Sequence, residues 1–505
     1  MMWEWLAAAV AVASPLSPAV AQTPLFGESE QAAILDEYIQ FLAIHNVAAD
    51  TAGIRRNAEA LVAMMARRGL RPQLLKGADP SVPPAVYGEW KVPGASRTLV
   101  LYAHYDGQAV TPEDWKSTRP FEPKLYSDRL DRGGKPVLDW KRARLDPDWR
   151  LYGRSASDDK AGIMAILAAV DRLRSEGKRP AFNLKLVFEG EEEAGSPHLA
   201  GIIGANRALL KSDGWIIFDG PANPSGAKQV VLGVRGVVGA EITVYGPSRP
   251  LHSGHYGNWA PNPAMDLAQL LASMKDRDGK VTIKGFYDGI TPFTAKERKA
   301  LAAIPNTDAK LKADLALGRS EGGGVPVAEA VQLPSLNIDG IRSADVGSRA
   351  RNVIPSTATA TLDMRLVAGN DYRRQFDRLV AHIRSFGFEV IDRDPTLAER
   401  AAHVRLAKVT TDGGYNAERT PLDHPLALDV IAAVKRVERD TVVLPSLGGS
   451  LPLYVLREVL GAPSVTVAVA NADNNQHAED ENLRLGNLWD AIAIARSILS
   501  MERAK

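Results

Sequence analysis

Short apolar runs that alternate with helical segments are the feature that most limits the fold of this chain. The runs lie at residues 98–107, 182–190, 213–220 and 460–471. Each is almost continuously apolar, as strands buried on both faces of a sheet are. A helical pattern at 158–177 separates the first two runs, and another at 487–500 follows the last. We therefore expect an α/β domain with a mostly parallel sheet.

The middle of the chain follows a different pattern. Residues 237–247 and 357–367 alternate apolar and polar side chains, as strands exposed on one face do. Helical patterns lie between and after these two segments. We predict an α+β domain over residues 239–417, inserted between two parts of the α/β domain at 22–238 and 418–505.

Residues 1–21 resemble a secretory signal peptide. An apolar stretch ends in Ala19-Val20-Ala21, a small-x-small cleavage pattern. Glu4 and the lack of Lys or Arg before the stretch are atypical, which leaves a cytoplasmic protein with a loose N-terminal helix as the alternative. The sequence predicts an exported protein, located in the periplasm.

The composition excludes several classes of chemistry and partner. The 505 residues include no cysteine, which excludes disulfides, thiolate-bound zinc and thiol catalysis. Any metal must be held by His, Asp and Glu. The 61 basic residues balance the 60 acidic ones, so no net field favours nucleic acid or an anionic membrane.

Acidic residues and histidines follow the apolar runs at the point where each predicted strand ends. They are His104, Asp106, Glu189, Glu191, Glu192, Glu193, Asp219 and His477, and Asp158 and Asp159 open the long helix. The carboxyl ends of parallel strands meet at one edge of the sheet, where α/β proteins bind ligands. So many buried carboxylates are costly together unless a cation lies among them.

Each of these patterns is weak when taken singly. A lone HxD is often a capping pair, a run of glutamates is often a solvated loop, and an acid pair before a helix is favoured by the helix dipole. Their common position at the strand ends favours a metal site over a merely acidic surface. We assign no role to Glu189 or Glu191, and we expect Glu191 to be solvated.

At this point the sequence resembles the M20 family of co-catalytic zinc peptidases, the aminoacylase, carboxypeptidase and carnosinase-like group. The resemblance rests on "LYAHYD", "YGRSASDDKAG", "EEEAGS", "IIFDG", "PLHSGHYGNWAPNP" and "NNQHAEDEN", which occur in the family order. It implies a zinc-exopeptidase type of catalytic domain with a dinuclear metal site. Residues 239–417 would then form the family's lid and dimerisation domain.

The resemblance also implies a set of ligands for two divalent ions. His104, Asp158 and Asp219 would hold one ion, and Asp158, Glu193 and His477 the other, with Asp158 as the bridge. In the family, the peptide bond after this bridging residue is cis, which here would join Asp158 to Asp159. Zinc is the expected metal, although carboxylate and imidazole ligands also admit manganese and cobalt.

Further residues receive catalytic or substrate-binding roles by the same resemblance. Glu192 would be the general base, Asp106 would orient the imidazole of His104, and His252 would reach across a homodimer to the partner's reaction centre. Arg365 and Ser450 would contact substrate. Asp412 stands where the carnosinase-like branch tends to have a histidine, which leaves open whether the C-terminal carboxylate of a substrate is bound.

These assignments predict hydrolysis of a peptide or amide bond in small substrates, by a dipeptidase or exopeptidase. Two ions about 3.5–4 Å apart would share a hydroxide and polarise the scissile carbonyl. A deacylase acting on N-acyl amino acids is an alternative that the metal centre does not separate from a peptidase. A non-catalytic metal- or peptide-binding relative is a second alternative.

Overall fold

A computed structural model of the chain describes residues 25–502 except residues 78, 80 and 116. Its larger sheet has eight strands in the order β1-β2-β6-β3-β7-β20-β8-β19. Their bounds are Gln73–Leu75, Ala85–Trp90, Asn183–Glu189, Thr98–His104, Gly214–Phe218, Ser464–Val467, Gln229–Val231 and Val442–Leu444. The central strands β6, β3, β7 and β20 run parallel, and β1 and β2 are antiparallel additions at one edge. The predicted α/β class with a mostly parallel sheet is confirmed.

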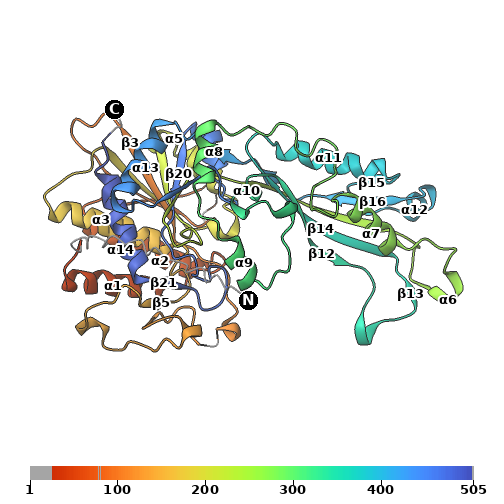
Figure 1. Cartoon of the computed structure of the whole chain (residues 1–505), viewed down its shortest axis with the longest axis horizontal. Coiled ribbons are helices and arrows are strands. Elements are labelled where there is room, and N and C mark those ends of the chain that lie inside the picture. Colours follow the sequence, from red (N-terminus) through yellow and green to blue (C-terminus); the bar gives the residue numbers. More distant parts are fainter. Residues whose placement is uncertain (1–24, 78, 80, 116, 503–505) are drawn as a thin grey trace, which may run out of the picture.

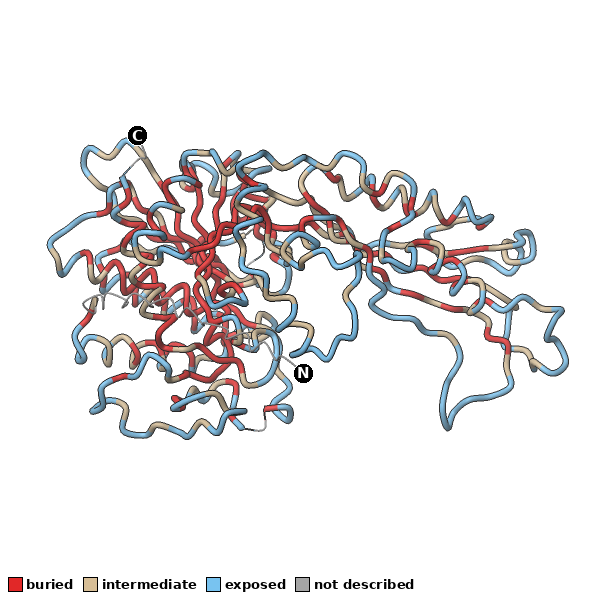
Figure 2. The backbone as a smooth tube through the Cα atoms, in the orientation of Figure 1, coloured by how far each residue is buried: buried red, intermediate tan, exposed pale blue. Residues whose placement is uncertain are grey.

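Both faces of this sheet are buried, as the continuous apolar runs predict. Along β3, Leu99, Leu101 and Ala103 join one core, while Val100 and Tyr102 join the core on the other face. The first core is covered by helices α1, α2, α3, α13 and α14 at Glu28–Leu42, Thr51–Arg67, Lys160–Ser175, Pro425–Val437 and Leu485–Leu499. The second is covered by α4, α5 and a π-helical turn at Leu199–Ala205, Arg207–Leu210 and Leu456–Leu460. Figure 2 shows this buried interior.

The second sheet has the strand order β12-β14-β10-β16-β15, and β17 pairs with β10. Its strands span Ser335–Arg342, Thr357–Leu366, Gly236–Tyr245, Leu406–Thr410, Glu389–Ile391 and Gly414–Tyr415. Helices α7 at Pro263–Ser273 and α11 at Tyr372–Ser385 pack on one face. Along β10, Val238, Ala240, Ile242 and Val244 point to that core, which explains the alternating sequence. The chain enters this sheet through β9 at Gly233–Val234 and leaves it through β18 at Glu418–Arg419, which pairs with β9.

Part of the predicted inserted domain packs against the first sheet instead of the second. Helix α8 at Ala295–Ala302 contacts β19, and Ile304 after it packs beside Val442 and Leu444. Helices α9 at Asp308–Asp314 and α10 at Val327–Ala330 follow, and the Gln332 amide then donates to the carbonyl of Ser446. Ile304 is packed there, whereas Leu315, Leu317 and Leu333 later in the segment are exposed. Helical periodicity alone does not reveal this contact with the first sheet.

The second sheet extends away from the first and ends in a narrow tip (Figure 1). The tip holds β11 at Leu251–His252, β13 at Val353–Ile354 and the short helix α6 at Ser253–Tyr256. Helix α12 at Leu397–Ala402 also lies in this sheet's half of the molecule (Figure 1). The predicted signal peptide at 1–21 falls outside the described residues. Within the described part of the chain, no helix is both long and apolar enough to cross a membrane.

A leucine pair tests the burial of helix α3. Leu167 has no exposed surface, whereas Leu138 is 85% exposed. Leu167→Ala is expected to lower the free energy of unfolding by about 2–5 kcal/mol, because it leaves a cavity in a close-packed core. Leu138→Ala should change it by less than about 0.5 kcal/mol. Urea unfolding followed by circular dichroism measures both, and equal effects would contradict the packing described for α3.

Candidate metal centre

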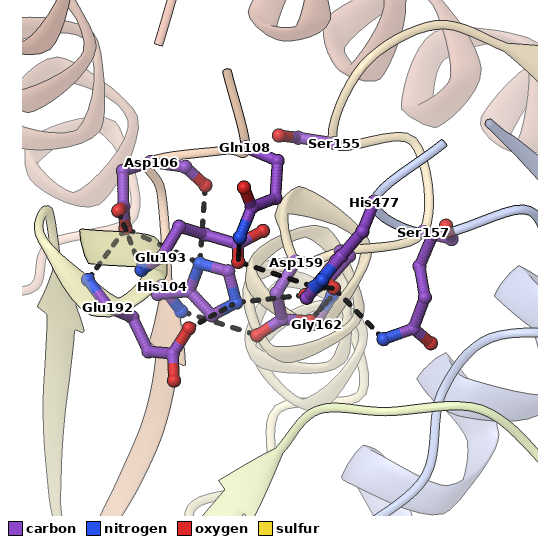
Figure 3. A network of polar contacts seen from close by, with 12 residues as sticks. His104, Asp106, Gln108, Ser155, Ser157, Asp159, Gly162, Glu192, Glu193 and His477 are labelled. Atoms are coloured by element: carbon purple, nitrogen blue, oxygen red, sulfur yellow. Dashed lines mark hydrogen bonds and ion pairs between the residues drawn. The ribbon is translucent and has the colours of Figure 1, made fainter. Parts of the chain in front are cut away.

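The strand-end residues meet at one edge of the larger sheet. His104 ends β3, Glu189 ends β6, and Asp219 directly follows β7. Because these strands are parallel and adjacent, their ends point to the same place. Asp158 and Asp159 precede α3, and His477 comes from the loop after β20. Figure 3 shows the side chains of His104, Glu193 and His477 gathered in one place.

Asp158 lies between the two histidines and offers one carboxylate oxygen to each. Its Oδ1 is 3.0 Å from His104 Nε2, and its Oδ2 is 3.1 Å from His477 Nε2. Glu193 Oε2 is 3.3 Å from the same His477 nitrogen. Asp158, Glu193 and His477 therefore converge, and Asp158 contacts both histidines.

These separations fit the donor geometry of zinc. Ligand atoms about 2.0–2.1 Å from a tetrahedral ion lie about 3.3–3.4 Å from one another. Two sets of three potential ligand atoms lie within 4.8 Å of one another: His104 with Asp158 and Glu193, and His104 with Asp159 and Asp219. The donors are imidazole nitrogens and carboxylate oxygens, which suit zinc, manganese and cobalt. The cluster therefore offers ligands for divalent metal, although both sets share His104 and neither is one of the two sets that the resemblance implies.

Asp159 is close to the cluster, but its carboxylate accepts hydrogen bonds from backbone N–H groups. Its Oδ2 accepts the amide proton of His104 at 3.2 Å, and its Oδ1 accepts that of Gly162 at 3.3 Å. The Asp158–Asp159 peptide bond is cis, as the family resemblance implies. These contacts leave Asp158, rather than Asp159, with its carboxylate directed at both histidines.

Burial sets the charge state of the acidic cluster in the absence of a cation. It raises the pKa of Glu193 to about 8 and that of Asp219 to about 6, and the Asp158 carboxylate adds to both shifts. Burial also raises the pKa of Glu192 well above its ordinary value. Burial would raise that of Asp158, but its hydrogen bonds with His104 and His477 hold it well below the usual range. Divalent ions would favour the ionised form of all four groups.

Asp106 connects one histidine to the glutamate loop. Its Oδ1 lies 3.4 Å from His104 Nδ1. The same carboxylate accepts the backbone N–H of Glu192 at 3.1 Å and of Glu193 at 3.0 Å. Asp106 thus contacts the imidazole and also holds the turn at Glu192–Ala194, which the sequence did not indicate.

Glu192 lies beside the cluster with its carboxylate facing a cavity of about 400 Å³. Its Oε2 is 3.8 Å from His104 Nε2, and its side chain is 11% exposed. Glu192 is in neither set of clustered ligand atoms. A carboxylate that would lie beside bound ions without ligating them is the arrangement that a general base requires.

Arg365 and Ser450 line the same cavity and contact each other. Arg365 donates through Nη1 to Ser450 Oγ at 2.8 Å and through Nε to Asp363 at 2.8 Å. Arg365 comes from the second sheet and Ser450 from the loop after β19. Asp412 lies in an exposed turn and is not among the described residues that line this cavity.

His252 is exposed and directly precedes α6, which lies at the tip of the second sheet (Figure 1), and it is not among the described residues that line the cavity. Its Nδ1 accepts the N–H of Gly254 at 3.0 Å, and its ring lies 4.6 Å from that of His255. One chain by itself therefore does not bring His252 to the metal site.

Several site residues escaped the sequence analysis. Gln108 donates to Glu193 at 2.9 Å and Gln476 donates to Asp158 at 3.1 Å. The adjacency of Gln476 to His477 was the available signal. The expectation for Glu191 was wrong, because its side chain is only 13% exposed and accepts from His198. Glu189 is buried and accepts from the hydroxyl of Tyr102.

Glu481 is another residue of the site that the sequence patterns did not indicate. It is fully buried and accepts from Arg154 Nη1 at 2.7 Å. It also accepts the backbone N–H groups of Ser155, Ser157 and Asp158 at 2.9–3.0 Å. This carboxylate therefore holds the loop that carries the bridging aspartate, beside the small sheet of β4 at Lys124–Tyr126, β5 at Arg150–Tyr152 and β21 at Asn482–Arg484.

Comparison with known proteins agrees with this geometry. Residues 100–501 match the model of peptidase family M20/M25/M40. The chain belongs to this family. It is accordingly a metallopeptidase, and the predicted family assignment is confirmed.

Individual relatives resemble the chain over most of its length. The Cys-Gly metallodipeptidase DUG1 of Candida albicans is 26% identical over 427 residues, which cover 83% of this chain and 81% of the relative. The human Beta-Ala-His dipeptidase is 24% identical over 462 residues, covering 88% and 81%. The crystal structure of the M20 family metallo-carboxypeptidase Sso-CP2 from Sulfolobus solfataricus superposes with a TM-score of 0.75 at 29% identity, covering 92% and 98%.

Replacing Glu481 tests its hold on the Asp158 loop. Glu481→Gln leaves the buried charge of Arg154 unpaired, so the free energy of unfolding should fall by about 3–5 kcal/mol. Metal affinity should fall by about 10–100-fold, because the bridging ligand loses its support. Chemical denaturation and competition with a chelator measure the two effects. Glu479→Gln, an exposed change in the same loop, is the control; a similar loss there would contradict the assignment.

Proposed function

We propose that this M20 metallopeptidase is a dipeptidase that uses two divalent ions, with zinc as the native metal. The proposal rests on the carboxylate of Asp158, which presents one oxygen toward His104 and the other toward His477. His104, Asp158 and Asp219 would hold one ion, and Asp158, Glu193 and His477 the other. The two dipeptidases compared above support a dipeptide substrate over an N-acyl amino acid.

The metal pair, when bound, supplies Lewis-acid polarisation of the scissile carbonyl and an acidified water. Glu192 takes the proton of the attacking water at its carboxylate and delivers it to the leaving amine. Asp106 contacts both the imidazole of His104 and the backbone N–H of Glu192, and so fixes their relative positions. Arg365 and Ser450 would bind the substrate's C-terminal carboxylate, since a guanidinium and a hydroxyl offer it charge-assisted hydrogen bonds. Asp412 is exposed and is not among the described residues that line the cavity, which supports binding of this carboxylate.

Replacing the carboxylate of Glu192 tests the role of this residue as the general base. Glu192→Gln keeps the size of the side chain but cannot accept the proton, so kcat on a dipeptide should fall by about 10²–10⁴-fold. The metal content, measured by inductively coupled plasma mass spectrometry, should not change. Glu191→Gln, one residue earlier, is the matched control and should retain activity. Full activity of Glu192→Gln would refute the assignment.

We also propose that the enzyme works as a homodimer in which His252 of each copy completes the site of the other. The remote, exposed position of His252 supports this arrangement, and an imidazole there would stabilise the developing oxyanion. Export through the predicted signal peptide is consistent with this function and remains a prediction.

Mixing two inactive variants tests the exchange of His252. His252→Ala should lower kcat with the metals still bound, whereas His403→Ala, an exposed control, should not. When His252→Ala and Glu192→Gln chains are reassociated, half of the dimers are mixed and one of their two sites is intact, so about a quarter of the activity should return. No recovery, or a mass of one chain by light scattering, would contradict the shared site.

A further inference from the structure

The cavity beside the metal cluster has an apolar wall that the catalytic roles do not use. Leu447, Leu451 and Pro452 line it, and we call these three residues the leucine wall. They belong to the loop after β19 that also carries Ser450. Leu447 and Leu451 are half-buried, with part of each side chain packed against the core under the sheet and part left accessible.

The leucine wall is held in place by the backbone. The N–H of Leu447 donates to the carbonyl of Gly233 at 2.8 Å, and the N–H of Arg235 donates to the carbonyl of Gly449 at 3.1 Å. The ring of Tyr415, also in the cavity lining, stacks on Tyr454 with a centroid separation of 4.9 Å and an angle of 13°. An apolar ligand would therefore meet a preformed surface and would not have to order it.

We propose that the leucine wall is the subsite for the side chain of the substrate's C-terminal residue, and that the enzyme prefers dipeptides ending in a large apolar residue. The proposal rests on the dipeptidase function above. In a dipeptide, one residue separates the scissile carbonyl from the terminal carboxylate. With that carboxylate at Arg365 and Ser450, the residue's side chain lies beside the neighbours of Ser450, which include Leu451.

The positions of the charged residues that line the cavity favour an apolar side chain on the substrate's C-terminal residue. Among its described lining residues, Arg365 is the one arginine or lysine. The lining carboxylates are Asp158, Glu192, Glu193 and Asp219, all of them at the metal cluster. A charged C-terminal side chain would lose hydration at the leucine wall without gaining a partner there. A C-terminal glycine in the substrate would leave the leucine wall exposed to water. A large apolar C-terminal side chain would cover the wall and remove its surface from water.

Rates of hydrolysis of two dipeptides, Ala-Leu and Ala-Gly, test the proposed subsite. On the metal-loaded enzyme, kcat/KM for Ala-Leu should exceed that for Ala-Gly by at least about 10-fold, the selectivity that an apolar pocket gives for added methylene groups. Leu451→Asn should lower kcat/KM for Ala-Leu by about 10-fold and leave Ala-Gly within about 2-fold. Leu428→Asn, at a leucine 40% exposed on α13, is the control and should change neither.

Equal rates on the two dipeptides, or an equal loss on both in Leu451→Asn, would overturn the subsite. Binding to the metal-loaded Glu192→Gln variant, measured by isothermal titration calorimetry, tests the wall apart from turnover. Ala-Leu should bind about 10-fold more tightly than Ala-Gly, and equal affinities would overturn the subsite. If the wild-type enzyme cleaves neither dipeptide while this preference persists, the dipeptidase function fails and the subsite stands.

Discussion

The carboxylate of Asp158 lies between two imidazoles, and the arrangement of the site depends on this shared contact. One oxygen is 3.0 Å from His104 and the other 3.1 Å from His477. Around it, burial pushes the pKa of Glu193 and Asp219 upward, so the cluster is unfavourable as a set of free anions. Cations bound on both sides of Asp158 would remove that penalty, and they would also supply the Lewis acids that peptide hydrolysis needs.

The parallel sheet and two buried acids together keep the residues of this site in position. The sheet brings His104 and Asp219 to one edge from adjacent strands. Glu481 holds the loop before α3 through backbone N–H groups, and Asp106 holds the turn that carries Glu192 and Glu193. The ligands are thus positioned by hydrogen bonds from residues that do not face substrate, which is how metal sites usually fix ligand orientation.

The site residues that could be predicted from sequence are the histidine and acidic residues that stand at the ends of apolar strands. His104 and Asp219 directly end or follow apolar strands, so their convergence follows from the parallel sheet. Glu481 could not be recognised, because it stands in "HAEDEN" among other acids and nothing in the pattern marks the one that is buried. The contact between Arg365 and Ser450 joins two sheets across 85 positions of sequence, and the return of α8 to the first sheet depends on packing alone. Periodicity defines a face of a helix or strand but not the surface that covers it.

The most direct test of the shared aspartate is a crystal structure of the metal-loaded enzyme with anomalous data collected at the absorption edge of the bound metal. We expect two peaks per chain about 3.5–4 Å apart, one beside His104 and one beside His477, with an oxygen of Asp158 bound to each. A single peak, or a second ion that does not contact Asp158, would contradict the dinuclear site.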